Sequence, residues 1–215
     1  MSLPFRTQRD VERAIPVVRD HLAAGKLLAY PTETVYGLGC APTETALTAL
    51  ANLKGRPPKK PFLLLVSSEK MPEDWRLVYS RAAEALAAAF WPGPLTLILN
   101  GGEGRLPDRL RGAEGGIGVR YTSHRGIRDL VEACGVPLTS TSANRPGSPP
   151  AAGAEGVEPL FADAVRAGDL LVLDGGVLGN VPPSSIVDCT QPLPRLVREG
   201  AIPRGELRRA VGSLA

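Results

Sequence analysis

The sequence predicts an α/β fold in which helices flank a mixed or mostly parallel sheet. Short apolar runs alternate with helix-periodic segments along the chain, as where the run at 26–30 is followed by the periodic segment at 46–53. The run "FLLLV" at 62–66 shows no alternation of apolar and polar residues, which is typical of a strand buried on both faces. The 24 glycines and 21 prolines are spread along the chain, so they indicate turns between many short elements.

Apolar residues at helical spacing over 11–22 predict a first helix that ends at Gly25, with Pro16 either kinking it or marking its start. Ser80 and Ser123 are expected N-caps of later helices. Strands are predicted at 26–30, 62–66, 95–99, 117–121, 136–141, 170–173 and 185–189. Further helices are predicted at 46–53, from Ser80 to about Phe90, from Ser123 to Cys134, near 157–167 and after Pro203.

The length predicts one domain, residues 1–215, or one large domain with a small appendage. At 43% hydrophobic, the chain can bury a substantial core without disulfides or a structural metal. The net charge of +3 does not demand a nucleic-acid partner, although clustered positive charge still could favour one. Three widely spaced cysteines, no apolar signal core and no run of membrane-spanning length predict a soluble, reduced, cytoplasmic protein without a membrane partner.

The tetrapeptide PTET occurs twice, in two different contexts. The second copy begins at Pro42 and leads into a helix-periodic segment, so Thr43 is expected to cap that helix and Glu44 to lie in its first turn. The first copy, residues 31–34, follows an apolar strand and leads into "VYGLG" with no helical period. Hydroxyl and carboxylate groups at the carboxyl end of a strand favour a ligand site in an α/β sheet, although a polar turn is the plainer interpretation.

Two further polar stretches could belong to the same site. The loop "LKGRPPKKPF" places Lys54, Arg56, Lys59 and Lys60 between a helix and a buried strand, and two prolines hold part of it extended. Such cations suit a polyphosphate, although a solvated basic loop is the commoner outcome. The stretch "LTSTSANRPGS" at 138–148 offers many small hydroxyl groups after a strand, which suits ligand recognition or an ordinary Ser/Thr-rich turn.

The common catalytic motifs are absent from the sequence. There is no Walker loop, complete dinucleotide fingerprint, nucleophile elbow or zinc-protease helix. His21 and His124 fall on predicted helices or their starts, where a histidine more often packs than acts as a base. The cysteines lie among apolar or small residues and are expected to be inert. The chemistry therefore depends on hydroxyl groups, lysine and arginine, which suits electrostatic catalysis.

Seven strings occur in the order and spacing of one known family and span about residues 10 to 205. They are "YPTETVYGLG", "LKGRPPKKPFLLLV", "WPGPLTLIL", "GVRY", "STSANRPG", "PPSSIVDCT" and "RLVREGAI". By these motifs the chain resembles the YrdC-like family. The departures are small: Glu199 stands where a proline is usual, Ser185 where a threonine is usual, and "VRYT" lacks a common proline.

The resemblance implies a twisted mixed sheet flanked by helices, with a deep positively lined groove. Members of the family are threonylcarbamoyl-AMP synthases, which form threonylcarbamoyl-AMP and pyrophosphate from L-threonine, bicarbonate and ATP. Their product serves the N6-threonylcarbamoyladenosine modification of tRNA, so downstream threonylcarbamoyl-transfer enzymes are implied partners. The chain resembles the short form of the family, which has no additional C-terminal domain.

The resemblance also assigns roles to individual residues. Threonine-binding positions are matched by Thr34, Arg120, Ser140 and Ser184, with Arg120 expected to fork onto the threonine carboxylate. ATP-binding positions are matched by Lys54, Arg56, Lys60, Ser142, Asn144 and Arg198. Lys54 and Arg56 form the implied catalytic pair. Mg²⁺ would enter with ATP, bound mainly through phosphate oxygens, so no metal site made by the protein is expected.

Two other functions stay open at this point. The same basic groove could bind tRNA or double-stranded RNA without chemistry, although base-stacking aromatic residues are missing near 54–60. A relative with the same fold could instead adenylate a different carbamoyl group. The basic pair and the "SAN" string argue for retained activity, but they do not decide which acceptor is used.

Overall fold

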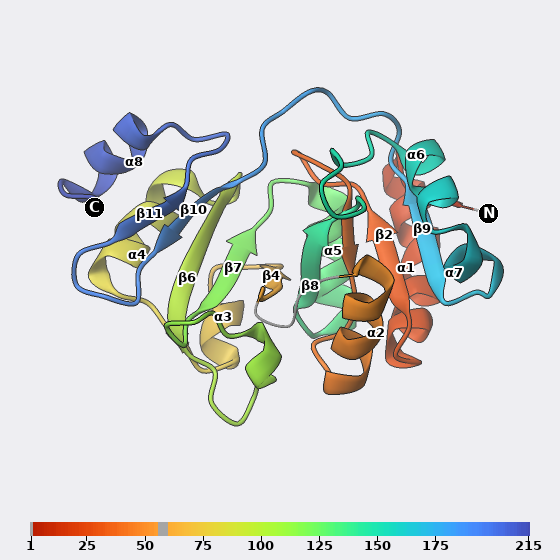
Figure 1. Cartoon of the computed structure of the whole chain (residues 1–215), viewed down its shortest axis with the longest axis horizontal. Coiled ribbons are helices and arrows are strands. Elements are labelled where there is room, and N and C mark those ends of the chain that lie inside the picture. Colours follow the sequence, from red (N-terminus) through yellow and green to blue (C-terminus); the bar gives the residue numbers. More distant parts are fainter. Residues whose placement is uncertain (1, 56–59) are drawn as a thin grey trace.

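The computed structural model describes residues 2–55 and 60–215, and these form one sheet flanked by helices (Figure 1). Among the described residues the strands follow the order β1-β9-β2-β3-β8-β4-β7-β6-β10-β11, and β5 pairs with β6 beside that path. The strands are β1 Leu3–Pro4, β2 Leu27–Tyr30, β3 Gly37–Gly39, β4 Leu63–Val66, β5 Leu77–Val78, β6 Leu95–Gly101, β7 Ile117–Tyr121, β8 Leu138–Ser142, β9 Leu170–Asp174, β10 Ser185–Asp188 and β11 Arg195–Arg198.

The sheet is mixed rather than mostly parallel. The pairs β1–β9, β2–β9, β4–β7 and β6–β10 are parallel. The middle of the sheet is antiparallel, because β3 and β8 both run against their neighbours. The α/β class and the helix-flanked twisted sheet predicted from the sequence are confirmed. The short strands β1, β3, β5 and β11 were not predicted as strands.

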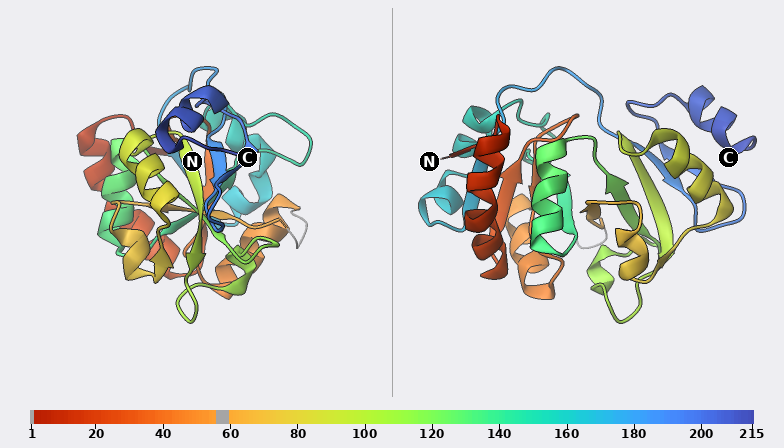
Figure 2. Two further views of the ribbon diagram at one scale, coloured as in Figure 1. Left: turned by 90° about the vertical axis from the view of Figure 1, so that its left-hand side faces the viewer. Right: turned by 180° about the vertical axis from the view of Figure 1, so that it is seen from behind.

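Helices cover both sides of this sheet (Figure 2). Helices α1 and α5 pack side by side on one face, and α2, α6 and α7 lie on the other. Helix α8 packs against α4 at the far end of the molecule. The bounds are α1 Gln8–Ala23, α2 Glu44–Lys54, α3 Met71–Asp74, α4 Arg81–Phe90, α5 Arg125–Cys134, α6 Ala154–Leu160, α7 Ala162–Arg166 and α8 Arg204–Val211.

The helix boundaries follow from local capping. Thr7 forms a capping box with Asp10 at the start of α1, so Pro16 lies inside this helix and does not mark its start. Ser80 caps α4 as predicted, since its hydroxyl accepts the N–H of Ala83. The single helix predicted near 157–167 is two helices, α6 and α7, because the backbone at Phe161 departs from helical angles.

The cap of α5 differs from the prediction. His124, not Ser123, is the N-cap, and its Nδ1 accepts the N–H of Ile127. The backbone N–H of Ser123 instead donates to a carboxylate oxygen of Glu33 at 3.0 Å. The prediction was wrong because serine and histidine can both accept a bond from a helix N–H, and a contact distant in sequence decided between them.

The core consists mainly of leucine, valine, isoleucine and alanine, as the composition predicted. Tyr30 and Tyr36 are fully buried within it, and each hydroxyl donates to a backbone carbonyl, of Thr139 and Gly176 respectively. Burial without such partners would be costly for a phenol. Among the described residues, no helix combines the length and apolar character needed to cross a membrane.

The two glycines of "VYGLG" allow a close approach between strands. A Cβ on Gly39 would lie 1.9 Å from the backbone oxygen of Thr139, so only glycine lets β3 and β8 come this close. Gly37 faces the Tyr30 ring in the same tight packing. The sequence predicted that these glycines allow a close approach to a backbone or a ligand. At Gly39 the group that comes close is the backbone of β8. This brings the segment before β3 next to the end of β8.

Candidate functional site

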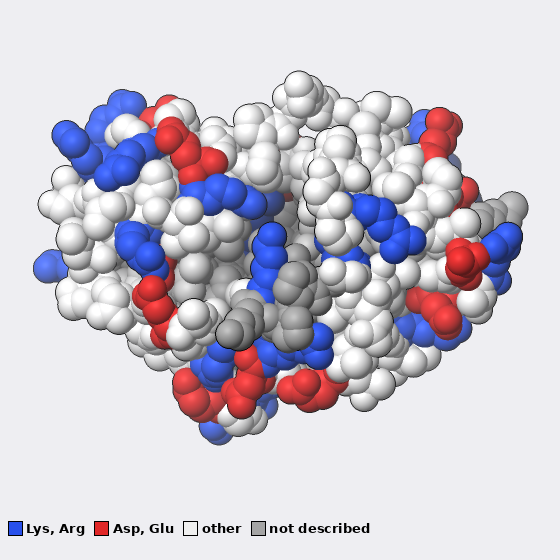
Figure 3. All heavy atoms as spheres, in the orientation of Figure 1, with Lys and Arg blue, Asp and Glu red and all other residues white. Residues whose placement is uncertain are grey.

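A cavity of about 370 Å³ opens on the face of the molecule that Figure 3 shows. Figure 3 shows Lys and Arg side chains gathered around the hollow in the middle of this face. Its lining comes from the β2–β3 connection and from β4, β6, β7, β8, β10 and β11. The predicted site residues that line it are Thr34, Lys60, Arg120, Ser140, Ser142, Ser184 and Arg198.

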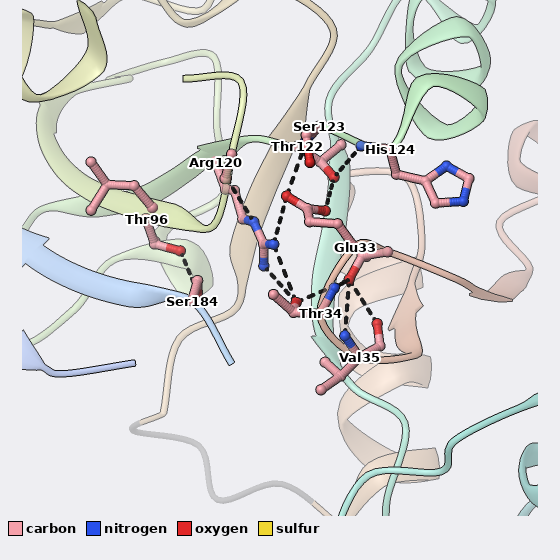
Figure 4. Close-up of polar contacts among 12 residues, drawn as sticks. Glu33, Thr34, Val35, Thr96, Arg120, Thr122, Ser123, His124 and Ser184 are labelled. Carbon is pink, nitrogen blue, oxygen red and sulfur yellow. Dashed lines mark hydrogen bonds and ion pairs between the residues drawn. The ribbon is translucent and has the colours of Figure 1, made fainter. Parts of the chain in front are cut away.

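One side of the cavity, which we call the Arg120 wall, consists of Thr34, Arg120 and the neighbouring Glu33 (Figure 4). Arg120 is only 4% exposed, and both its Nη1 and its Nη2 lie 3.2 Å from the Thr34 hydroxyl oxygen. Its Nε donates to the backbone oxygen of Gly93 at 3.3 Å. The guanidinium is therefore held at several of its five N–H groups before any ligand binds.

The carboxylate of Glu33 neutralises the charge of Arg120. Its Oε1 lies 2.8 Å from Arg120 Nη2, and the Thr122 hydroxyl donates to its Oε2. Burial alone would raise the pKa of the Glu33 carboxyl, but the Arg120 charge and hydrogen bonds from Thr122 and Ser123 outweigh it and hold that pKa below its usual value. Glu33 is thus an ionised, partly buried partner of Arg120 rather than a proton donor.

Thr32 shapes the turn that presents Thr34. The Thr32 oxygen accepts the backbone N–H groups of Thr34 and Val35, each at 3.2 Å, and donates to the Val35 carbonyl at 2.8 Å. The hydroxyl oxygens of Thr32 and Thr34 lie 3.1 Å apart, and the Thr34 hydroxyl accepts from Arg120. The first PTET therefore forms a turn that its own hydrogen bonds stabilise, and this turn lies at the cavity.

The second PTET serves only to start α2. The Thr43 hydroxyl accepts the N–H of Ala46, and Glu44 lies exposed in the first turn. Both features agree with the prediction from the sequence. The same four residues thus have two structural roles, which depend on whether a helix-periodic segment follows them.

The other side of the cavity, which we call the Arg198 wall, consists of Thr96, Ser184 and Arg198. The hydroxyl groups of Thr96 and Ser184 lie 2.9 Å apart (Figure 4), and the Arg198 guanidinium donates to the Ser184 carbonyl at 2.7 and 3.1 Å. Within residues 2–55 and 60–215 no carboxylate forms an ion pair with Arg198. Burial and the like charge of Arg120 both lower the pKa of Arg198. This wall is suited to an anionic ligand.

The polar stretch at 138–148, which comprises β8 and the loop after it, divides into residues that line the cavity and residues that support it. Ser140 and Ser142 line the cavity, whereas Thr139 bonds to the backbone of Cys40 and belongs to the core. Lys54, at the end of α2, is buried, and its ammonium donates to the backbone oxygens of Ser142 and Asn144 and to the Asn144 side chain. Neither Lys54 nor Asn144 lines the cavity. Their contacts hold Ser142, the last residue of β8, and the loop that follows it.

The basic loop is only partly described. Lys60 lines the cavity, but Arg56 and Lys59 lie outside the described residues. The predicted convergence of Thr34, Ser142 and Arg198 on one cavity is present in the structure. The part assigned to Arg56 stays a prediction.

Sequence reasoning missed two polar residues of the site. Thr122 follows β7 directly, so the rule that selected Thr34, a polar residue at the end of a strand, could have found it. Thr96 stands among the apolar residues of 95–99 in β6 and is 1% exposed. A lone hydroxyl in a buried strand needs a partner, and this requirement was the available signal.

No described cysteine or histidine supplies a nucleophile or base to the cavity. Burial raises the pKa of the Cys40 thiol to about 11 and of the Cys189 thiol to about 12, and it lowers the pKa of both histidines. Among the described residues, no three His, Cys, Asp or Glu side chains are placed to hold a metal ion together. The cavity offers hydroxyl groups and cations, as expected.

Fold and site together define an α/β protein with a cavity lined by hydroxyl groups and cations, a lining that suits an anionic small molecule. Residues 20–200 match the Sua5/YciO/YrdC family, which carries the description telomere recombination. The chain belongs to this family.

Named relatives fit this assignment. The chain is 41% identical over 168 residues to the threonylcarbamoyl-AMP synthase of Chromohalobacter salexigens, covering 78% of this chain and 88% of that protein. The Pyrococcus abyssi threonylcarbamoyl-AMP synthase is 33% identical over 96% of this chain, but only 60% of that protein is covered. The crystal structure of P. abyssi Sua5 with L-threonine superposes with a TM-score of 0.87 at 31% identity, over 100% of this chain and 62% of that one. The chain thus spans about three fifths of the Pyrococcus protein.

Proposed function

We propose that this protein forms threonylcarbamoyl-AMP and pyrophosphate from L-threonine, bicarbonate and ATP. The relatives named as threonylcarbamoyl-AMP synthases support this, as does the solved relative that holds L-threonine. The observation that carries the proposal is the cavity itself. Hydroxyl groups and the Arg120 guanidinium lie on one side of it, and the charge of Arg198, unpaired among the described residues, lies on the other. Such a cavity can hold an amino acid beside a polyphosphate.

The residue roles follow the resemblance and are proposals. The threonine would contact Thr34, Arg120, Ser140 and Ser184. ATP would meet Arg56, Lys60, Ser142 and Arg198 directly. Lys54 and Asn144 would act at the same site through the loop that they hold, since their polar atoms bond to it and to each other.

The chemistry needs orientation and charge neutralisation more than a proton acceptor. The threonine amine and bicarbonate give a carbamate and water; one carbamate oxygen then bonds to the α-phosphorus as the bond to pyrophosphate breaks. Arg198 and Lys60 would stabilise the negative charge on the phosphates, and the cavity would keep water from the carbamate. Mg²⁺ bound to phosphate oxygens would add charge neutralisation, and the described residues offer no competing metal cluster.

The wider setting belongs to the same proposal. The product would pass to downstream threonylcarbamoyl-transfer enzymes that modify tRNA, in the cytoplasm. Direct contact with tRNA or double-stranded RNA is not needed for the reaction. Residues 10–205 would act as one catalytic domain.

One assay tests the proposal. Purified protein is given ATP, bicarbonate and single amino acids, and the release of pyrophosphate is measured. We expect release to require both bicarbonate and threonine, with serine a poor replacement. Release that is independent of bicarbonate, or equal with any amino acid, would refute the proposal. RNA binding without any pyrophosphate release would instead favour the RNA-binding alternative.

A further inference from the structure

Arg120 has few N–H groups left for a ligand. An arginine side chain carries five N–H groups. Within the described residues, the Nε group donates to Gly93, one Nη1 group to Thr34, and the two Nη2 groups to Thr34 and Glu33. One N–H at Nη1 remains, and Arg120 lines the cavity, so this is the group that it can offer to a bound molecule.

Glu33 determines this arrangement. Arg120 Nη2 is the guanidinium nitrogen closest to an oxygen, at 2.8 Å from Glu33 Oε1, compared with 3.2 Å to Thr34 and 3.3 Å to Gly93. The carboxylate is fixed in turn by the Thr122 hydroxyl and the Ser123 N–H, which follow β7 directly. Figure 4 shows this chain of contacts running from the segment after β7 through Glu33 to Arg120.

The charge of Glu33 also offsets a repulsion. Both arginines line one cavity, Arg120 as a buried residue and Arg198 as an exposed one, and the charge of Arg120 disfavours that of Arg198. Without the carboxylate, the buried Arg120 charge would have no counter-ion among the described residues, so the side chain would gain by turning toward water. Glu33 therefore provides both an anchor and a counter-charge.

We propose that Glu33 is a positioning residue, which fixes Arg120 so that a single Nη1–H points to one oxygen of the substrate carboxylate. The inference rests on the proposed function, in which Arg120 binds the carboxylate of the amino acid. It replaces the expected two-pronged contact with a one-pronged contact. The second carboxylate oxygen must then be bound by other groups of the cavity.

The chain contains a matched control for this test. Glu33→Gln keeps the size of the side chain and removes its charge. Glu44→Gln makes the same change at the same place in the second PTET, where the glutamate is exposed in the first turn of α2 and far from these contacts. The comparison separates any general effect of replacing glutamate by glutamine in this tetrapeptide from the specific loss of the ion pair with Arg120.

Steady-state pyrophosphate release is measured for both variants with threonine and with ATP varied in turn. For Glu33→Gln we expect the KM for threonine to rise about tenfold or more, as for one lost charge-assisted contact. The KM for ATP should stay within about twofold, since Arg198 keeps its own partners. Glu44→Gln should match the wild type. An unchanged threonine KM in Glu33→Gln, or an equal rise in both KM values, would overturn the proposal.

A second measurement does not depend on activity. The Arg120 Nε–H signal in a ¹⁵N NMR spectrum should be slow to exchange in the wild type and in Glu44→Gln. In Glu33→Gln it should broaden or disappear, because the guanidinium is no longer anchored. An unchanged signal would refute the positioning role. Wild-type protein without threonine-dependent release would refute the proposed function instead, and the NMR result would still decide whether Glu33 fixes Arg120.

Discussion

The two arginines of the cavity differ in how their charge is balanced. Arg120 has a carboxylate partner at 2.8 Å and donates further bonds to a hydroxyl group and a backbone oxygen. Arg198 has only the carbonyl and hydroxyl oxygens of Ser184, and no carboxylate among the described residues pairs with it. Among the described residues, one charge is paired within the protein, and the other is exposed and has no carboxylate partner, so it is open to a bound anion.

This difference separates stability from function. A charge that is paired within the fold stabilises the fold, and removing it leaves its partner buried and unpaired. A charge without an internal partner costs free energy in the empty protein and stabilises a bound anion. Arg120 and Arg198 should therefore respond in opposite ways to substitution.

The largest expected effect is on stability, from Arg120→Met. The substitution leaves the Glu33 carboxylate, 18% exposed, without its counter-ion. We expect the free energy of unfolding, measured by urea denaturation, to fall by about 3–5 kcal/mol. The double variant Arg120→Met with Glu33→Gln should recover part of this loss, because no charge then stays unpaired. Equal stability of the single and double variants would contradict the assigned ion pair.

The next effect is on activity, from Arg198→Ala. We expect kcat/KM for ATP to fall about 10²–10³-fold, as when one preorganised charge-stabilising donor is removed. The urea midpoint should stay the same or rise, because the repulsion from Arg120 is relieved. Near-normal turnover, or a loss of stability as large as that of Arg120→Met, would show that the two arginines do not differ as described.

The smallest effect is expected from pH. The pKa of Glu33 is lowered in the folded protein, so its ionised form contributes stability that is complete above the ordinary value of 4.5. As pH falls below that value and through the lowered pKa, the contribution is lost. The stability difference between wild type and Glu33→Gln should therefore shrink on acidification. A difference that is constant from neutral pH down to pH about 3 would exclude a lowered pKa.

The sequence was informative where a local pattern determines the structure. Thr43 and Ser80 cap helices because a hydroxyl group directly precedes a helix-periodic segment. The first PTET was placed at a ligand site because no such segment follows it, and its Thr34 does line the cavity. Strand β7 was predicted with its observed bounds, Ile117–Tyr121, because apolar residues and a following turn define it locally.

What could not be predicted depends on contacts between distant segments. Strand β3 consists of Gly37, Leu38 and Gly39, a composition that does not favour a strand, and forms because β2 and β8 lie on either side. The partner of Arg120 is 87 positions away in sequence, so neither the ion pair nor the loss of its two-pronged geometry could be read from "GVRY". Lys54 was likewise expected at the phosphates, and its bonds to the loop after β8 are visible only in the fold.

The sheet topology has a consequence for the newborn chain. Strand β2, which leads into the first PTET, pairs on one edge with β3 and on the other with β9, where Leu27 faces Leu170. During synthesis at 5–20 residues per second, β9 emerges on the order of ten seconds or more after β2. Until then one edge of β2 exposes unpaired backbone groups that can associate with another chain. This edge of β2 therefore stays without its native partner until most of the chain has been made.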